Sequence, residues 1–320
     1  MTPSLSASGP AQHNKAVVFA CDSNYAPFAL FAAEQIARLH PDRDFDICLC
    51  AMGEDLTPVE SLARHGFRYC RIGAEGMFTG LNLDARRTEA AYLRLALPGT
   101  FAADYRRLLY LDSDVFVERG GFSRLMDLDL GGKAVAAVRD NTQWRTPNRR
   151  PEQFRRLGLP TARYFNSGLL LIDVAGFNAG GVLQRCLDFA QAHDGRMIGH
   201  DQNLLNCVLQ GDWAELHPVW NWQYTRATML FEALEGARII HFIGAKKPWK
   251  HASGALPLKF RRAYRAFFAA HFPDAPQIGP DGLRPHQNRA YLRSLLYRHV
   301  VAAGSFTKYL DRFEDEWSVL

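Results

Sequence analysis

Paired cysteines, long apolar segments and a secretory signal are all missing from the sequence. The six cysteines form no C-x-x-C set and mostly sit inside apolar runs, which argues against a zinc ribbon or a disulfide framework. No segment approaches the roughly 20 apolar residues that a transmembrane helix needs, and the N-terminus lacks the charged start and apolar stretch of a signal peptide. We therefore expect a cytoplasmic protein, with any membrane contact peripheral and on the inner face of the cytoplasmic membrane.

The sequence also lacks a strong excess of charge of either sign. The chain has 38 lysines and arginines against 33 aspartates and glutamates, and a net charge of +5 is too diffuse to indicate nucleic-acid binding. Of its 320 residues, 48% are hydrophobic and 22% are charged. This composition excludes disorder throughout and fits one large α/β domain, with or without an appendage.

The first hundred residues alternate between strand-like and helix-like patterns. Apolar runs predict three buried strands, and apolar residues at helical spacing predict two helices between them. In chain order we expect a strand at 16–22, a helix at 25–40, a strand at 44–52, a helix at 57–66 and a strand at 67–73. This β-α-β-α-β order is typical of a parallel sheet that binds nucleotides.

The remainder of the chain divides near residue 273. We expect a helix at 86–98, strands at 106–111, 133–140 and 167–174, and a loop at 141–153. Segment 273–287 is rich in Pro and Gly and indicates a linker, and 288–310 has the apolar spacing of an amphipathic helix. We predict a disordered N-terminus (1–15), a main domain (16–272) and a linker with a basic helical tail (273–320).

An apolar strand ends in two carboxylates in the segment RRLLYLDSDVFVERG (106–120). Residues two apart in an extended segment point to the same side, so Asp112 and Asp114 can aim at one point, with Ser113 as the spacer. Their charges repel unless a cation lies between them, and Mg²⁺ or Mn²⁺ prefers such oxygen ligands and can also hold nucleotide phosphates. Two alternatives stay open: a solvated turn with Asp112 as a helix cap, and a phosphatase of the haloacid dehalogenase type. That phosphatase usually carries the motif on its first strand, whereas a whole β-α-β-α-β block comes first here.

A second polar cluster follows an apolar strand in IIHFIGAKKPWKH (239–251). The imidazole of His241 is either a third metal ligand or a packed core side chain. Gly244 would let backbone N–H groups approach phosphate oxygens, and Lys247 could neutralise those oxygens. The density of Gly, Lys, Pro and Trp after the histidine favours ligand binding.

Polar residues also border the first strand and the helix at 86–98. Asp22 and Asn24 lie at the sheet edge where open α/β sheets bind ligands, and they either contact a base or ribose or cap the next helix. Arg94 faces either a phosphate or an acidic surface, and the sequence alone does not decide.

Further polar residues interrupt apolar surroundings later in the chain. Asn166, Asp201 and Gln202 either point into a shared cleft or cap their elements. The aromatic residues of 220–225 (WNWQYT) either stack on a sugar or belong to the core. The arginines Arg145, Arg149 and Arg150, in the loop at 141–153, indicate an anionic acceptor or a lid.

Taken in order, six segments of the chain resemble glycosyltransferase family 8, which includes bacterial lipopolysaccharide galactosyl- and glucosyltransferases. They are VVFACDSNYA, YLRLALP, LLYLDSDVFV, YFNSGLLLIDV, HDQNLLN and HFIGAKKPWK, within residues 16–249. The resemblance implies a GT-A fold over 16–272, with a Rossmann-like nucleotide-binding mixed sheet flanked by helices. It also implies transfer of glucose or galactose, with retention of configuration, from UDP-glucose or UDP-galactose to a saccharide or glycolipid. The implied cofactor is Mn²⁺, or Mg²⁺ in its place.

The resemblance also implies roles for the residues at matching positions. The metal ligands would be Asp112, Asp114 and His241, the donor-site residues Asp22, Asn24, Arg94 and Ser113, the diphosphate contacts Gly244 and Lys247, and the residues around the transferred sugar Asn166, Asp201 and Gln202. Either Asp201 is a covalent nucleophile, or Gln202 steadies an oxocarbenium-like state while the acceptor attacks from the leaving-group face. We favour the second route.

Functions of two other classes could use the same residues. One is a metal-dependent phosphatase or nucleotide-sugar hydrolase, and the other is a non-catalytic UDP-sugar-binding protein. The tail leaves a separate question open, because segment 282–310 has five basic residues and no acidic ones. Its helix either lies on an anionic membrane near a glycolipid acceptor or packs on the main domain or a second copy.

Overall fold

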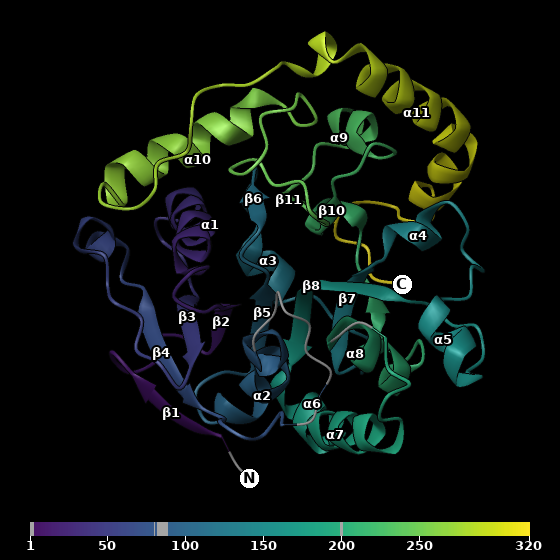
Figure 1. Cartoon of the computed structure of the whole chain (residues 1–320). Helices are drawn as coiled ribbons and strands as arrows, with labels where there is room; N and C mark the ends of the chain where they lie inside the picture. The colour runs from purple at the N-terminus through teal and green to yellow at the C-terminus, as the bar shows by residue number, and fades with distance from the viewer. Residues whose placement is uncertain (1–2, 80, 82–88, 199–200) are drawn as a thin grey trace.

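An eight-stranded mixed sheet forms the centre of the computed structural model, which describes residues 3–79, 81, 89–198 and 201–320 (Figure 1). The strand order is β1-β4-β3-β2-β5-β8-β7-β9. The strands are β1 (Ser4–Ala7), β2 (Lys15–Ala20), β3 (Asp46–Met52), β4 (Arg68–Gly73), β5 (Arg107–Leu111), β7 (Val135–Arg139), β8 (Phe165–Asp173) and β9 (Ala214–Glu215). A second sheet has the order β10-β11-β6, from β6 (Val115–Val117), β10 (Trp222–Gln223) and β11 (Ile239–His241).

The pairing of the strands confirms the predicted α/β sheet and makes it mixed. Strands β4, β3, β2 and β5 are parallel neighbours, whereas β8 runs antiparallel to both β5 and β7. The N-terminal segment differs from the expected disorder, because Ser4–Ala7 form β1 and pair antiparallel with β4. Gly73 stands opposite Ser4, and a side chain at Gly73 would overlap the serine hydroxyl. The missing side chain therefore leaves room for the Ser4 hydroxyl.

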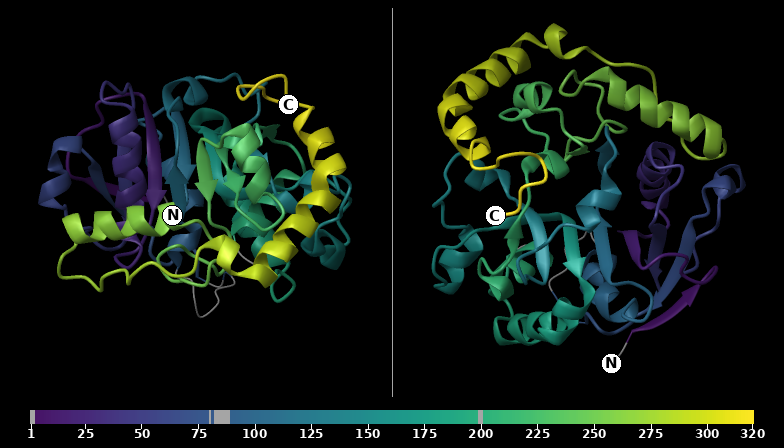
Figure 2. Two further views of the ribbon diagram at one scale, coloured as in Figure 1. Left: turned by 90° about the horizontal axis from the view of Figure 1, so that it is seen from above. Right: turned by 180° about the vertical axis from the view of Figure 1, so that it is seen from behind.

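Each face of the large sheet is buried against its own set of helices. Side chains alternate between the faces along a strand, so Val17 and Phe19 lie in one apolar cluster and Ala16 and Val18 in the other. Helices α1 (Ala26–Leu39), α3 (Phe122–Met126) and α10 (Leu258–His271) contribute to the first cluster. The second cluster includes α2 (Leu93–Thr100), α6 (Val174–Ala179), α7 (Val182–Ala192) and α8 (Asp201–Leu209), and Figure 2 shows the two layers from other sides.

Three local predictions need correction or completion. The helix expected at 57–66 is a shorter 3-10 helix, η1 (Glu60–His65), which ends at Gly66 with φ +60° as a left-handed cap. The described part of the helix expected at 86–98 consists of η2 (Glu89–Tyr92) and α2, and residues 86–88 lie outside the described residues. The loop expected at 141–153 contains α4 (Asn141–Trp144), whose first turn is capped by Asp140, and the start of α5 (Glu152–Leu157).

The C-terminal part of the chain wraps around the second sheet (Figure 1). It contains η3 (Pro218–Trp220), α9 (Met229–Glu235), α10, η4 (Pro285–Gln287) and α11 (Arg289–Leu310). The predicted tail helix is thus present, and it buries Phe306 against Trp144 of α4 and Phe231 of α9. The chain then returns to the large sheet, where Val319 bridges Leu216. Among the described residues, no helix is long and apolar enough to cross a membrane.

Candidate active site

Asp112, Asp114 and His241 meet where the two sheets join. Asp112 follows β5 and Asp114 precedes β6, and the antiparallel pairing of β11 with β6 sets His241 opposite Val115, the neighbour of Asp114. The Nε2 atom of His241 lies 3.1 Å from Oδ1 of Asp114 and 3.8 Å from Oδ2 of Asp112. One ligand atom from each residue lies within 4.8 Å of the others. The convergence expected from the sequence is therefore observed.

The donor set of this cluster fits a divalent cation. Two carboxylates and one imidazole supply oxygen and nitrogen ligands, which suit Mn²⁺ and, with more oxygen, Mg²⁺. The other ring nitrogen of His241, Nδ1, is 2.9 Å from Oδ1 of Asn221, so Nε2 remains directed at the carboxylates. Asp112 is not a helix cap, because strand β6 follows it and its carboxylate accepts hydrogen bonds from Arg94 and Tyr110.

Lys247 lies on the opposite side of Asp114 from the imidazole. Its ammonium group forms an ion pair with Oδ2 of Asp114 and donates to the carbonyl oxygen of Phe242. Burial raises the pKa of Asp114, but His241 and Lys247 outweigh burial and hold the pKa of that carboxyl below its ordinary value. The preceding Gly244 has φ +78° and open space where a side chain would be, so its backbone is accessible to a ligand.

Arg94 of α2 joins Asp112 to Asp201. Its Nη2 atom is 3.0 Å from Oδ1 of Asp112, and its Nη1 atom is 3.1 Å from Oδ2 of Asp201. The guanidinium also lies over the ring of Tyr110, 4.4 Å from its centre, and the Tyr110 hydroxyl donates to Oδ1 of Asp112 at 2.7 Å. Burial lowers the pKa of Arg94, but Asp112 and Asp201 raise it by more than burial lowers it. The net shift is upward, so the side chain stays charged. Arg94 thus faces an acidic pair within the site.

Asn166, Asp201 and Gln202 lie together, as one of the two sequence interpretations predicts. Nδ2 of Asn166 donates to Oε1 of Gln202 at 3.1 Å, and Ser167 N donates to the same oxygen at 3.2 Å. The Ser167 hydroxyl donates to Oδ2 of Asp201 at 2.8 Å. The start of α8 and the start of β8 are therefore joined by side chains that also reach Arg94.

Asp22, Asn24 and Ser113 lie at the same edge of the sheet as the cluster. Strand β2 is the parallel neighbour of β5, with Phe19 opposite Leu111, so residues that follow both strands emerge on one side. Asp22 accepts a hydrogen bond from Tyr25 N at 3.0 Å and thus holds the turn into α1, while Asn24 is exposed and Ser113 is buried.

Three residues of the site are missing from the sequence-based predictions: Tyr110, Ser167 and Asn221. Each sits inside an aromatic or apolar run, where its polar group would be expected to have a local partner rather than a functional one. The aromatic residues around Asn221 belong to the core, since Trp220 and Trp222 are fully buried, so the sugar-stacking interpretation is wrong for both. A single amide between two buried tryptophans indicates a specific polar contact, because a buried amide requires hydrogen-bond partners.

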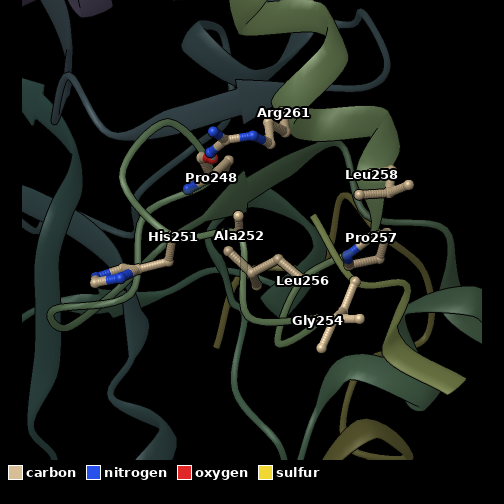
Figure 3. A pocket seen from close by; sticks show the side chains of 9 residues that line it. Pro248, His251, Ala252, Gly254, Leu256, Pro257, Leu258 and Arg261 are labelled. Carbon is tan, nitrogen blue, oxygen red and sulfur yellow. The ribbon is translucent and has the colours of Figure 1, made fainter. Parts of the chain in front are cut away.

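A small pocket lies next to the Lys247 segment (Figure 3). Residues of the loop between β11 and α10 line it together with Arg261 of α10 and Leu283. Arg261 closes one side, with its guanidinium donating to Pro248 O and Pro280 O, both at 3.0 Å. The pocket therefore marks the contact between this loop and the C-terminal segment rather than the carboxylate cluster.

Two solved glycosyltransferases share this fold. The galactosyltransferase LgtC in complex with donor and acceptor sugar analogues superposes with a TM-score of 0.64 at 24% identity, over 82% of this chain and 97% of LgtC. The bifunctional glycosyltransferase WbbM superposes with a TM-score of 0.62 at 18% identity, over 88% of this chain and 52% of WbbM. The protein thus has the GT-A fold of glycosyltransferases.

The family model described as Glycosyl transferase family 8 matches residues 16–253, and the chain belongs to this family. General stress protein A of Bacillus subtilis is 33% identical over 178 residues, 51% of this chain and 59% of that protein. Lipopolysaccharide 1,2-glucosyltransferase of Escherichia coli is 30% identical over 173 residues, 51% of this chain and 49% of that protein. The chain thus spans about half the length of these curated relatives.

Proposed function

We propose that the protein is a retaining hexosyltransferase that moves glucose or galactose from a UDP-sugar to a saccharide or glycolipid acceptor. The observation that carries this proposal is the Asp112, Asp114 and His241 cluster, with Lys247 and Arg94 beside it, in a chain of glycosyltransferase family 8. Family membership supports glycosyl transfer over phosphate-ester hydrolysis. The names of relatives such as the lipopolysaccharide glucosyltransferase support a hexose donor and a glycolipid acceptor.

In this proposal the cluster binds Mn²⁺ or Mg²⁺ through Asp112, Asp114 and His241. When bound by these residues, a cation would supply positive charge near the leaving diphosphate, as metals do in other phosphate chemistry. Lys247 would turn from Asp114 to the diphosphate, where the backbone at Gly244 also approaches the phosphate oxygens. Asp22, Asn24 and Ser113 would contact the nucleoside, because they emerge at the same sheet edge.

We further propose that the acceptor attacks from the leaving-group face without a covalent enzyme intermediate. Asp201 is a poor nucleophile because its Oδ2 accepts from Ser167 and pairs with Arg94, and the whole residue is buried. Gln202 is neutral, and with Asn166 it lies beside the acidic pair, where it would steady a positively charged sugar. Arg94 would then hold Asp201 and Asp112 at a fixed separation.

The proposal is tested with a panel of nucleotide sugars incubated with Mn²⁺ and scored for UDP release and for transfer to sugar acceptors. We expect release from UDP-glucose or UDP-galactose, loss of metal-dependent transfer in Asp112→Asn, and nearly unchanged UDP binding in Gln202→Ala. Asp212→Asn is the matched control, because Asp212 is exposed and forms a surface ion pair with Lys133. Full transfer by Asp112→Asn would contradict the metal role, and phosphate release from simple esters would favour a phosphatase.

We also propose that the protein works in the cytoplasm, on the inner face of the membrane, with 16–272 as the catalytic domain and 273–320 as a tail packed on it. The six cysteines are free and buried, which suits a reducing compartment. Helix α11 supports membrane contact: Leu296, Tyr297, Val300 and Val301 are exposed on it, among basic residues.

A further inference from the structure

A chain of buried amides connects His241 to Gln202. Nδ1 of His241 lies 2.9 Å from Oδ1 of Asn221, and Nδ2 of Asn221 donates to Oδ1 of Asn166 at 2.9 Å. Nδ2 of Asn166 in turn donates to Oε1 of Gln202 at 3.1 Å. Asn221 has no exposed surface, so its amide relies on these partners, among the residues that the structure describes, for hydrogen bonds that water would otherwise supply.

Backbone groups fix the direction of this chain independently of the histidine. Gly168 N donates to Oδ1 of Asn166 at 3.1 Å, and Ser167 N donates to Oε1 of Gln202 at 3.2 Å. A backbone N–H can only donate, so the oxygens of both side-chain amides must point toward these two groups. Oδ1 of Asn166 then requires the NH₂ group of Asn221, which leaves only the oxygen of Asn221 to face the imidazole.

The orientation of Asn221 therefore decides the tautomer of His241. An oxygen at 2.9 Å from Nδ1 requires a proton on Nδ1, so Nε2 is the ring nitrogen that faces Asp112 and Asp114 and is available to a cation. The ring occupies space that Gly168 leaves open, because a Cβ atom at that position would overlap Cε1 and Nδ1 of His241. Gly168 thus leaves space for the imidazole, and Asn221 sets which ring nitrogen faces the carboxylates.

We propose that Asn221 is a positioning residue that couples the cation site to the residues around the transferred sugar. Its oxygen holds His241 as a ligand, and its NH₂ group holds the Asn166 and Gln202 amides in one orientation. This inference rests on the proposed function of the same site and adds a residue to it. Asn221 itself contacts neither the carboxylate pair nor Gln202, and it acts through its two neighbours.

The isosteric substitution Asn221→Asp separates the two roles. A carboxylate still accepts from Nδ1 of His241, and its charge favours the ligand form of the ring. It has no N–H for Oδ1 of Asn166, so two oxygens would face each other and the Asn166 amide would reorient. We expect Mn²⁺ affinity, measured by calorimetry without donor, to be no weaker than in the unmodified protein, while kcat falls at least about tenfold. Asn221→Ala loses both hydrogen bonds, and we expect its Mn²⁺ affinity to fall about 10–100-fold as well.

Gln143→Ala is the matched control, because Gln143 is an equally buried amide whose partners are backbone groups away from His241. We expect it to lower the melting temperature without changing Mn²⁺ affinity. Parallel losses of Mn²⁺ affinity and kcat in Asn221→Asp, in step with its melting temperature, would overturn the proposal and leave a packing role. Unchanged Mn²⁺ affinity in a folded Asn221→Ala variant would also overturn it. The affinity measurement needs no turnover, so absence of transfer by the unmodified protein would count against the proposed function and not against the role of Asn221.

Discussion

Glu215 is a carboxylate with no exposed surface, and it pairs with arginines from distant parts of the chain. Arg139 of β7 binds both of its oxygens, at 2.8 and 2.6 Å, and the Tyr309 hydroxyl of α11 donates to Oε1 at 2.9 Å. Arg312, just after α11, lies 3.3 Å from each oxygen. A charge that is buried and paired in this way is costly to leave without its partner.

We therefore expect Glu215→Gln to lower the free energy of unfolding by about 3–5 kcal/mol, since Arg139 would keep a buried and unneutralised charge. Asp212→Asn removes an acidic partner of similar size from an exposed pair with Lys133, and we expect a loss below about 1 kcal/mol. Urea unfolding followed by circular dichroism measures both. Equal losses in the two variants would show that the buried cluster contributes no more than a surface ion pair.

At the same scale, the sequence predicts those site residues whose chemistry is unusual for their surroundings. Asp112 and Asp114 end an apolar strand, and His241 ends another, so their convergence could be expected, while their role as ligands remains a proposal. Asn221 and Tyr110 could not be found in this way, because an amide or phenol in an aromatic run has the composition of a core. The pairing of β10 with β11 brings Asn221 near His241, and the packing of α2 sets Arg94 over the Tyr110 ring.

Among the elements, α11 follows its sequence pattern most closely. The predicted helix at 288–310 is present as Arg289–Leu310, and its buried residues Tyr291, Leu295, His299, Ala302 and Phe306 recur at the three- and four-residue spacing of one helix face. Elements whose local patterns were weaker differ more from expectation. Without a long apolar stripe, 57–66 forms only a 3-10 turn, and capping by Asp140 starts a helix where polar residues indicated a loop.

The exposed face of α11 leads to a prediction about membrane binding. Val300 is 76% exposed, and Val300→Glu adds a negative charge and removes an apolar contact at the proposed membrane face. We expect binding to vesicles containing phosphatidylglycerol to weaken about thirtyfold, because each charge near such a surface is worth about 1 kcal/mol and apolar burial adds a similar amount. Co-sedimentation measures this change.

Leu39→Glu is the control for vesicle binding, since Leu39 is a half-exposed leucine at the end of α1, away from α11 (Figure 1). We expect it to bind vesicles as the unmodified protein does. If neither the unmodified protein nor Val300→Glu binds vesicles, the membrane proposal fails. It also fails if Val300→Glu turns a dimer into a monomer in gel filtration, because the exposed face then serves contact between copies.

For the whole molecule, the C-terminal segment and the Lys247 loop form one structural unit. Leu283 N donates to Ala252 O at 3.0 Å, and Nδ2 of Asn288 donates to Ser253 O at 2.8 Å. A methyl group on Gly282 would overlap the carbonyl oxygen of Ala252. Composition indicates a boundary near residue 273, but it cannot reveal these contacts, because they join segments that are about thirty residues apart in the chain.

Gly282→Ala should therefore disturb the loop that carries Lys247. We expect UDP affinity, measured by calorimetry with Mn²⁺, to fall several-fold, because the 252–253 backbone must move to make room. Gly304→Ala places the same methyl group in α11, where nothing lies within 4 Å, and should leave UDP affinity unchanged while slightly favouring the helix. Identical UDP affinities in both variants would mean that the tail does not support the loop.

The two terminal segments of the chain also pair with strands near the edges of the large sheet. Strand β1 is its outermost strand on one side, and on the other side Val319 bridges Leu216 while Glu215 and Leu320 exchange backbone hydrogen bonds at 2.8 and 3.0 Å. Unpaired strand edges invite pairing with other chains, and short terminal segments that cover them act against aggregation. Trimming either end to obtain a smaller protein would thus uncover β4 or β9 and favour association through exposed backbone.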